Sequence, residues 1–362
     1  MHIPVRLGAR SYSIVVEPGG LAKLGDHLRP LGLGAKTAVV SDVAIRARYG
    51  ATVSDSLRTA GFTVVEVDVP DGERAKTIEA AARCWDALVD ARLDRSSTVV
   101  ALGGGAVGDL AGFVSATYMR GTNFVQVPTT ILAQVDASVG GKTAIDHPHG
   151  KNLIGSFHQP RLVLIDPLTV LSLPGRDFRS GLAEMVKHGV VLDAAHFDDL
   201  QRSVPSVLAR DAGTLERLIG DSCALKASVV ERDPEEKAEI RFALNYGHTI
   251  GHALEAATAY ARWTHGEAVA LGILAEARLA RRVGIASDDT VRRQETLLTA
   301  LGLPTRAEGL DAGRVLDAIG RDKKARDGRI PFVLAPAIGT FRVVYDIRRD
   351  DIRAAIAELA SS

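Results

Sequence analysis

The residues best suited to chemistry lie in the segment 241–255, where five polar side chains stand out from apolar sequence. They are spaced by four, three, four and three residues, so that on a helix they share one face: Arg241, Asn245, His248, His252 and Glu255. A solvated helix face normally carries Lys and Glu, whereas this one carries Arg, Asn and two His. Histidines at positions i and i+4 can share a metal ion or divide the roles of ligand and base. A lone helical His is usually a satisfied core residue, but five polar residues in register favour a functional site.

A metal ion needs more ligands than this segment supplies. His265 stands at a predicted helix start, and the apolar segment 181–189 carries Glu184 and, three residues on, Lys187. One carboxylate and two imidazoles with an open coordination position form a zinc-type catalytic set, which nickel, cobalt or iron could also occupy. The alternative for Glu184 and Lys187 is a surface ion pair worth about 0.2–0.5 kcal/mol.

A glycine-rich turn follows the apolar run 98–102. Gly103, Gly105 and Gly108 fit the spacing G-x-G-x-x-G, which brings backbone N–H groups at a helix start close to a pyrophosphate. No acidic residue follows about 20 positions later to bind a ribose, and Asp42, after an earlier strand, is the nearest candidate. A tight turn without a ligand is an equally valid interpretation of this motif alone.

Further polar clusters follow predicted strands, where open α/β sheets bind ligands. There are three such clusters: Asp71, Glu73 and Lys76; Thr129 and Thr130; and Asp136, Lys142, Lys151 and Asn152. Helix capping and solvation would explain the first two clusters. In the third cluster, lysines beside paired glycines suggest phosphate binding.

The elements that must position these residues change in type along the chain. Short β-branched runs at 11–16, 37–41, 63–69, 98–102, 123–127 and 162–165 alternate with helical segments such as 44–60 and 76–91. This alternation predicts a Rossmann-like α/β domain with a parallel sheet in residues 1–174. Residues 175–362 are mainly helical, with amphipathic blocks at 215–230, 241–257 and 267–282, a late hairpin at 330–334 and 341–345, and a last helix at 351–360.

Composition narrows the classes of partner. Lys and Arg together number 44, as do Asp and Glu, so no net charge attracts the chain to nucleic acid or to an acidic membrane. Its two cysteines, Cys84 and Cys223, make a disulfide framework unlikely for 362 residues. No secretory signal or uncharged apolar stretch of about 18 residues is seen, so we expect a cytoplasmic protein with no membrane partner.

These segments together resemble the 3-dehydroquinate synthase family, in collinear order over nearly the whole chain. The matching motifs lie at 103–109, 128–130, 136–146, 151–155, 157–160, 181–189, 245–255, 265–269 and 322–324. The resemblance implies an NAD-binding domain in residues 1–174 and a helical metal- and substrate-binding domain in residues 175–362.

The resemblance also implies roles for individual residues. Glu184, His248 and His265 would bind one divalent metal ion, Zn2+ or Co2+. NAD+ contacts are implied for Asp42, Asp71, Glu73, Lys76, Gly105, Ala106, Val107, Gly108, Asp109, Thr129, Thr130, Lys142, Lys151 and Ser172. Substrate contacts are implied for Arg120, Asp136, Lys142, Asn152, Lys187, Lys226, Arg241, Asn245, His252 and Lys324, among which Lys142, Lys187, His252 and Asp136 would be catalytic.

The implied reaction converts 3-deoxy-D-arabino-heptulosonate 7-phosphate to 3-dehydroquinate and phosphate in the shikimate pathway. It proceeds by transient oxidation with NAD+, phosphate elimination, reduction and an intramolecular aldol closure. Arg120, Lys142, Asn152 and Lys324 would bind the phosphate, Arg120 from the second subunit of a homodimer, while Lys226 and Arg241 would bind the carboxylate. One departure is the segment 233–240, which is one residue longer than the family pattern and lacks its glycine.

Three other functions fit parts of the sequence. A different sugar phosphate cyclase would act on a substrate without a carboxylate, but Arg241 would then be a buried charge without its counterion. A metal-dependent polyol dehydrogenase would release NADH, and the lysine-rich phosphate cluster disfavours it. A non-catalytic NAD-binding protein would not need both a set of metal ligands and a group of positively charged side chains.

Overall fold

The computed structural model describes residues 1–320 and 330–360. The chain divides into two compact units. Unit 1 comprises Met1–Leu173 and Leu215–Glu235, and unit 2 comprises Pro174–Thr214 and the described residues from Glu236 onward. The division expected from the sequence, after residue 174, differs from these units mainly in assigning Leu215–Glu235 to the second part.

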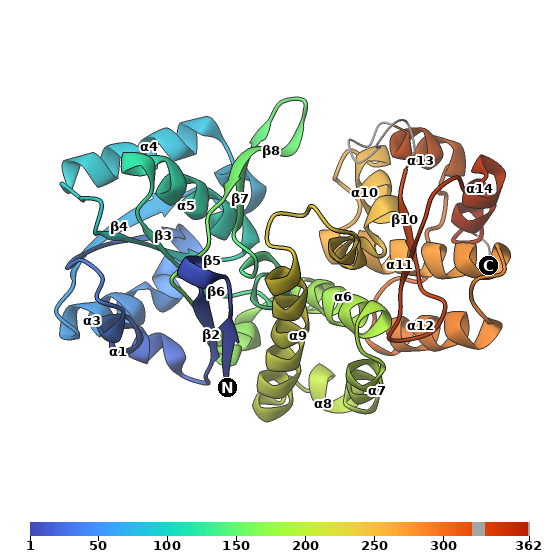
Figure 1. The fold of residues 1–362 in the computed structure, drawn as a ribbon, viewed down its shortest axis with the longest axis horizontal. Helices are drawn as coiled ribbons and strands as arrows, with labels where there is room; N and C mark the ends of the chain where they lie inside the picture. The colour runs from blue at the N-terminus through green and yellow to red at the C-terminus, as the bar shows by residue number, and fades with distance from the viewer. Residues whose placement is uncertain (321–329, 361–362) are drawn as a thin grey trace. The chain divides into compact units, whose positions relative to one another are not determined.

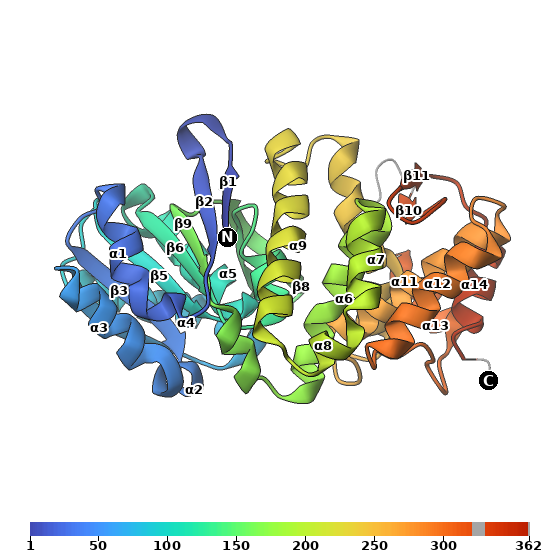
Figure 2. The ribbon, with the colours of Figure 1, turned by 90° about the horizontal axis from the view of Figure 1, so that it is seen from below.

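Unit 1 is built on a seven-stranded sheet in the order β1-β2-β9-β6-β5-β3-β4. All neighbouring strands are parallel except β1 and β2, which form an antiparallel hairpin at one edge of the sheet (Figure 2). The strands are β1 His2–Val5, β2 Tyr12–Val16, β3 Lys36–Asp42, β4 Thr63–Val69, β5 Thr98–Gly103, β6 Asn123–Pro128 and β9 Leu162–Ile165. Each strand predicted in this half is confirmed within about two residues, because continuous β-branched runs are typical of strands buried on both faces.

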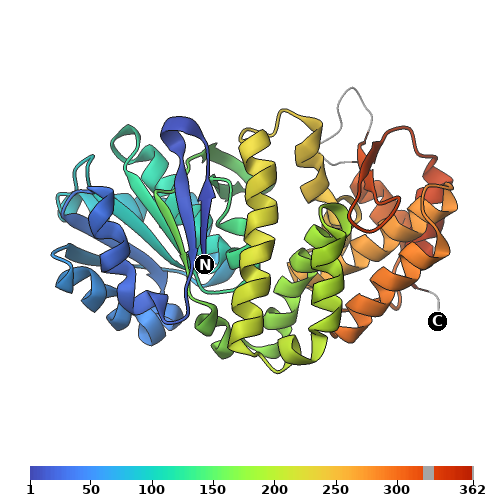
Figure 3. The same cartoon turned by 60° about the horizontal axis from the view of Figure 1, so that its bottom comes forward.

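Helices cover both faces of the sheet (Figure 1). α4 (Ile78–Asp90) and α5 (Gly105–Thr117) pack on one face, while α1 (Leu24–Leu28) and α3 (Ala51–Thr59) pack on the other. Successive residues of a strand point to opposite faces, so β3 sends Ala38 and Val40 into one core and Val39 into the other. The short α2 (Val43–Ile45) and most of α9 (Ala212–Arg232) complete the helices of this unit, and α9 is one uninterrupted helix, yellow in Figure 3.

A second hairpin of unit 1 lies outside the large sheet. β7 (Lys142–His147) and β8 (Gly150–Phe157) pair antiparallel, with an irregularity in register between Ile145 and His147. These two strands are not among those predicted from the sequence, because Gly140 and Gly141, both with positive φ, precede a polar run without clear alternation.

Unit 2 is mainly helical, as predicted. Its elements are α6 Gly175–Val191, α7 Ala194–Arg202, α8 Val204–Leu208, α10 His248–Ala257, α11 His265–Arg282, α12 Asp288–Ala300, α13 Ala312–Ile319, α14 Arg349–Ala357, β10 Phe332–Leu334 and β11 Arg342–Val344. α11 is buried almost all round and packs against α6, α10, α12 and α14. β10 and β11 form the predicted late hairpin. Within the described residues, no helix is long and apolar enough to span a membrane.

The prediction of one helix over residues 241–257 is wrong. Glu239–Asn245 forms a 3-10 helix, and α10 begins only at His248. Gly247 has a φ of 77°, a left-handed conformation that ends one helix before the next begins. Arg241 and Asn245 therefore do not lie on a helical face with His248, although His248 and Glu255 are both on α10.

Candidate functional site

A carboxylate and two imidazoles meet in unit 2 at the contact of three helices. Glu184 lies on α6, His248 begins α10, and His265 begins α11. Glu184 is fully buried, and its Oε1 atom lies 3.5 Å from His248 Nε2 and 3.7 Å from His265 Nε2. The structure thus brings together three residues that are far apart in sequence.

The spacing and orientation of these donors fit a divalent metal ion. Two ligands on a tetrahedral zinc-type ion, bonded at about 2.0–2.2 Å, lie about 3.4 Å apart, close to the observed separations. Both imidazoles use Nδ1 elsewhere: His248 Nδ1 lies 3.0 Å from the carbonyl oxygen of Tyr246, and His265 Nδ1 lies 3.3 Å from Glu255 Oε2. Each ring therefore presents Nε2 toward Glu184, as metal-ligating histidines do.

The electrostatics of the cluster favour positive charge. Burial alone would lower the pKa of His265, but Glu184 and Glu255 outweigh burial and raise that pKa to about 10. The two carboxylates therefore stabilise a cation on or beside this ring. A divalent ion at this point would take the place of the proton.

Two further polar side chains lie beside the cluster. The Lys187 ammonium contacts Glu184 Oε2, so the two oxygens of Glu184 face different partners. The ring of His252 is centred 5.2 Å from that of His248 and 5.7 Å from that of His265. One ring nitrogen from each of these three histidines lies within 4.8 Å of the other two, so His252 is a further possible donor for the same ion.

Arg241 and Asn245 belong to unit 2 but lie on the 3-10 helix before α10. Arg241 is 4% exposed, and its Nε atom lies 3.1 Å from Glu236 Oε1. Glu236 has a positive φ of 57°, within the segment that lacks the family's usual glycine. Lys324 lies outside the described residues.

The glycine-rich turn of unit 1 leads directly into α5. Its N-cap, Gly104, makes no side-chain cap hydrogen bond, so no capping side chain satisfies the first N–H groups of the helix, at Gly105, Ala106 and Val107. The close packing of the turn explains some of its glycines. A Cβ on Gly108 would meet Gln126 Oε1 at 2.7 Å, and one on Gly105 would meet the Ala137 Cβ at 3.2 Å.

A buried lysine organises the polar residues beside this turn. Lys76 is 3% exposed, and its Nζ donates to Asp109 Oδ2 at 2.7 Å and contacts the Asn152 side-chain oxygen. Asp146 Oδ1, which accepts from the Asn152 backbone N–H at 2.8 Å, lies 3.9 Å from the same Nζ. Burial would lower the pKa of Lys76, but Asp109, Glu73 and Asp146 outweigh it and raise the pKa. Lys76 is therefore a charged cross-link between the strand-end loop, α5 and the β7–β8 hairpin.

Other members of the proposed site also form pairs within unit 1. Lys151 Nζ lies 3.2 Å from Glu73 Oε2; partial desolvation would raise the pKa of Glu73, but the positive charges of Lys76 and Lys151 outweigh it and lower that pKa. Lys226, on α9, donates to the side chain of Asp136 at 2.6 Å and to its carbonyl oxygen at 2.5 Å. These contacts join candidate cofactor residues to each other, and a candidate substrate lysine to a candidate catalytic carboxylate.

Several predicted residues have structural contacts in unit 1. Asp42 caps α2 through a hydrogen bond from the Ile45 N–H at 2.9 Å, and Thr130 Oγ1 accepts from the Ala133 N–H at 3.1 Å. Ser172 Oγ lies 2.8 Å from the hydroxyl of Tyr49. Thr129 is buried, whereas Asp71, Lys142 and Arg120 are exposed. Arg120 has a positive φ of 65°, so the backbone presents it in a strained conformation.

Sequence reasoning gave no role to three residues that contact this site. Glu255 and the Tyr246 carbonyl orient the histidines. Glu276 accepts from the Gly247 N–H at 2.7 Å, at the start of α10. The spacing of Glu255 from His252 was visible, but its contact with His265, ten residues later, depends on the packing of α10 against α11.

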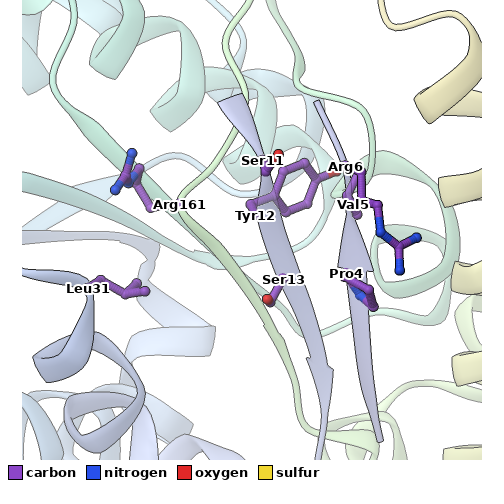
Figure 4. A pocket seen from close by; sticks show the side chains of 8 residues that line it. All are labelled: Pro4, Val5, Arg6, Ser11, Tyr12, Ser13, Leu31 and Arg161. Atoms are coloured by element: carbon purple, nitrogen blue, oxygen red, sulfur yellow. The ribbon is translucent and has the colours of Figure 1, made fainter. Parts of the chain in front are cut away.

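The hollow in Figure 4, beside the β1–β2 hairpin, is lined by Tyr12 and Arg161 among others and by none of the predicted site residues.

Comparisons with known proteins agree with these motifs. Residues 66–180 match the family described as 3-dehydroquinate synthase N-terminal, and residues 181–325 match 3-dehydroquinate synthase C-terminal. A 3-dehydroquinate synthase from Geobacter metallireducens is 50% identical over 94% of this chain and 95% of its own.

Solved structures support the same fold. 2-Epi-5-epi-valiolone synthase from Streptomyces hygroscopicus, solved with NAD+ and Zn2+, has a TM-score of 0.88 and is 28% identical, covering 96% of each chain. 2-Deoxy-scyllo-inosose synthase, solved with carbaglucose-6-phosphate, NAD+ and Co2+, has a TM-score of 0.88 at 24% identity, covering 99% of this chain and 100% of its own. The predicted fold class and the family resemblance are both confirmed.

Proposed function

The chain belongs to the 3-dehydroquinate synthase family, and we propose that it converts 3-deoxy-D-arabino-heptulosonate 7-phosphate to 3-dehydroquinate and phosphate. The observation that carries the proposal is the convergence of Glu184, His248 and His265 in a geometry that fits a divalent ion. Identity of 50% to a 3-dehydroquinate synthase over nearly the full length of both chains supports the activity.

The metal-binding residues are Glu184 through Oε1 and His248 and His265 through Nε2, and we infer that the ion is Zn2+ or Co2+. When bound, the ion supplies a Lewis acid for substrate hydroxyl oxygens, and NAD+ supplies a reversible hydride acceptor. Lys187 and His252 lie beside these ligands, so an ammonium and an imidazole are available to hold and transfer hydroxyl protons.

The NAD+ site draws on unit 1. The first N–H groups of α5 would bind the pyrophosphate, since they are unsatisfied by the helix itself. Charged and polar side chains of unit 1 would hold the remainder of the cofactor. They are Asp42, Asp71, Glu73, Lys76, Asp109, Thr129, Thr130, Lys142, Lys151 and Ser172.

The phosphate and the carboxylate of the substrate each need their own group of positively charged side chains. Lys142, Asn152, Lys324 and the partner's copy of Arg120 would bind the phosphate, so the active form is a homodimer. Arg241 and Lys226 would bind the carboxylate, with Asp136 beside Lys226 and Asn245 holding a substrate hydroxyl. Residues 1–174 then serve as the NAD-binding domain and residues 175–362 as the metal- and substrate-binding domain of a cytoplasmic enzyme.

Phosphate release from two sugar phosphates tests this function. The metal-loaded protein, with NAD+ present, should release phosphate from 3-deoxy-D-arabino-heptulosonate 7-phosphate and not from sedoheptulose 7-phosphate, which lacks the carboxylate. Chelation of the metal should abolish release, and added Zn2+ or Co2+ should restore it. Release only from sedoheptulose 7-phosphate would assign the chain to another cyclase activity, and no release from either would contradict cyclase activity altogether.

A further inference from the structure

Glu255 is a buried carboxylate that contacts one of the metal-binding histidines. It lies on α10, is 7% exposed, and places Oε2 3.3 Å from His265 Nδ1. Burial of a carboxylate is unfavourable unless a partner compensates it, and an imidazole N–H is such a partner. The burial of Glu255 is therefore explained by its contact with His265 and not by any role at the protein surface.

The two metal-binding histidines are oriented in the same sense by different groups. His248 Nδ1 faces the carbonyl oxygen of Tyr246, an uncharged acceptor fixed in the backbone. His265 Nδ1 faces Glu255, a charged acceptor at the end of a side chain. A carbonyl oxygen can only accept, so His248 carries its proton on Nδ1 and leaves the Nε2 lone pair for a metal. Glu255 gives His265 the same protonation pattern and adds a negative charge.

The local backbone does not orient the His265 ring by itself. Thr264 and Glu267 form a capping box, which fixes the main chain at the first turn of α11. The imidazole lies beyond two rotatable side-chain bonds and is 31% exposed. In the observed rotamer, Nδ1 contacts Glu255 while Nε2 lies 3.7 Å from Glu184 Oε1.

We propose that Glu255 is a positioning residue that orients His265 and makes its Nε2 a stronger metal donor. The inference rests on the proposed function, because it concerns the metal ligands named there. The negative charge of Glu255 also matters: Glu184 and Lys187 together carry no net charge, so Glu255 gives this group of side chains a net negative charge toward a divalent cation. Loss of such a contact typically weakens metal binding by about 10–100-fold.

The test measures metal affinity directly, apart from activity. Zn2+ is titrated into metal-free protein against a chromophoric chelator, and Co2+ binding is followed by its visible absorption bands, which report ligand geometry. Glu255→Gln keeps the size and an acceptor oxygen but removes the charge, whereas Glu255→Ala removes both. Glu295→Gln is the matched control, because it removes one carboxylate of the same unit that pairs with Arg278 rather than with a histidine.

We expect Zn2+ affinity to fall about 10-fold in Glu255→Gln and up to about 100-fold in Glu255→Ala, with altered Co2+ bands, and to be unchanged in Glu295→Gln. The denaturation midpoint of metal-free Glu255→Gln should stay near that of the unsubstituted protein. Unchanged Zn2+ affinity and Co2+ bands in both Glu255 variants would overturn the inference while leaving the proposed function intact. Failure of the unsubstituted protein to bind one ion per chain would overturn the proposed metal site and this inference with it.

Discussion

Gly266 sets how closely α11 approaches α6 beside the candidate metal-binding residues. It follows His265, and its backbone N–H donates to Ser180 Oγ at 3.1 Å, one helical turn before Glu184 on α6. A Cβ at this position would lie 1.8 Å from the Ser180 carbonyl oxygen, whereas ordinary carbon–oxygen contacts begin at about 3.3 Å. Gly266→Ala must therefore displace the start of α11 by about 1.5 Å, because the opposing atom belongs to the backbone and cannot rotate away.

That displacement predicts two measurable effects. Overpacking of this size costs about 1–3 kcal/mol of unfolding free energy. The separation of His265 Nε2 from Glu184 Oε1 would grow from 3.7 Å to about 5 Å, beyond the spacing of two ligands on one ion, so Zn2+ affinity should fall by about 100-fold.

Urea unfolding of the metal-free protein and a Zn2+ competition titration measure both effects. Gly175→Ala is the control, because Gly175 begins the facing helix α6 and a Cβ there would meet nothing nearer than 3.7 Å. We expect that variant to be neutral or more stable by up to about 1 kcal/mol. If Gly266→Ala matches the unsubstituted protein in both unfolding midpoint and Zn2+ affinity, the argument from close helix packing is refuted.

Three further predictions follow from buried groups. Glu184→Gln removes the carboxylate that contacts buried Lys187, so the unfolding free energy of the metal-free protein, measured in urea, should fall by about 3–5 kcal/mol. Adding Lys187→Met should recover much of this loss, and no recovery would contradict the pairing. Burial raises the pKa of Cys84 and of Cys223 from 9.0 to about 12, so at pH 8 only about 1 thiol in 10,000 is ionised. A thiol reagent should therefore modify both cysteines only after denaturation, and rapid labelling of the native protein would contradict this. Because the two thiols ionise at a lower pH in the unfolded chain than in the folded protein, their raised pKa also lowers the free energy of unfolding as the pH rises from about 9 toward 12. Arg241→Lys keeps the charge but loses the planar donor pair, so KM for the acid substrate should rise about 10-fold or more with kcat less affected; an unchanged KM would refute the carboxylate role.

The fold of unit 1 was largely predictable because its strands are short, continuous and apolar. β9, for example, was predicted to the residue, since all four of its residues are buried. The β7–β8 hairpin was not predictable in the same way, because seven of the eight residues of β8 are exposed and its sequence therefore lacks a buried face. The assignment of Leu215–Glu235 to unit 1 depends on long-range packing, which helical periodicity does not encode.

The candidate metal-binding residues could be chosen from residue type, whereas their geometry could not be predicted from the sequence. The histidine spacing correctly indicated that His248 and His252 lie on one helix, whereas the polar spacing from Arg241 onward wrongly predicted that this helix runs through Gly247, where a positive φ ends it. The donors of α6 and α11 converge through close contacts such as that of Gly266 with Ser180. The role of Glu255 likewise appears only when α10 and α11 are packed together.

The central claim is that NAD+ is reduced to NADH and re-oxidised within each turnover, and one measurement tests it most directly. The metal-loaded protein is supplied with excess 3-deoxy-D-arabino-heptulosonate 7-phosphate and a trace of NAD+, and phosphate, 3-dehydroquinate and NADH are quantified together. We predict phosphate and 3-dehydroquinate in equal amounts, many per NAD+, without net NADH. Product limited to one per NAD+, with NADH accumulating in proportion, would contradict the account and indicate a dehydrogenase.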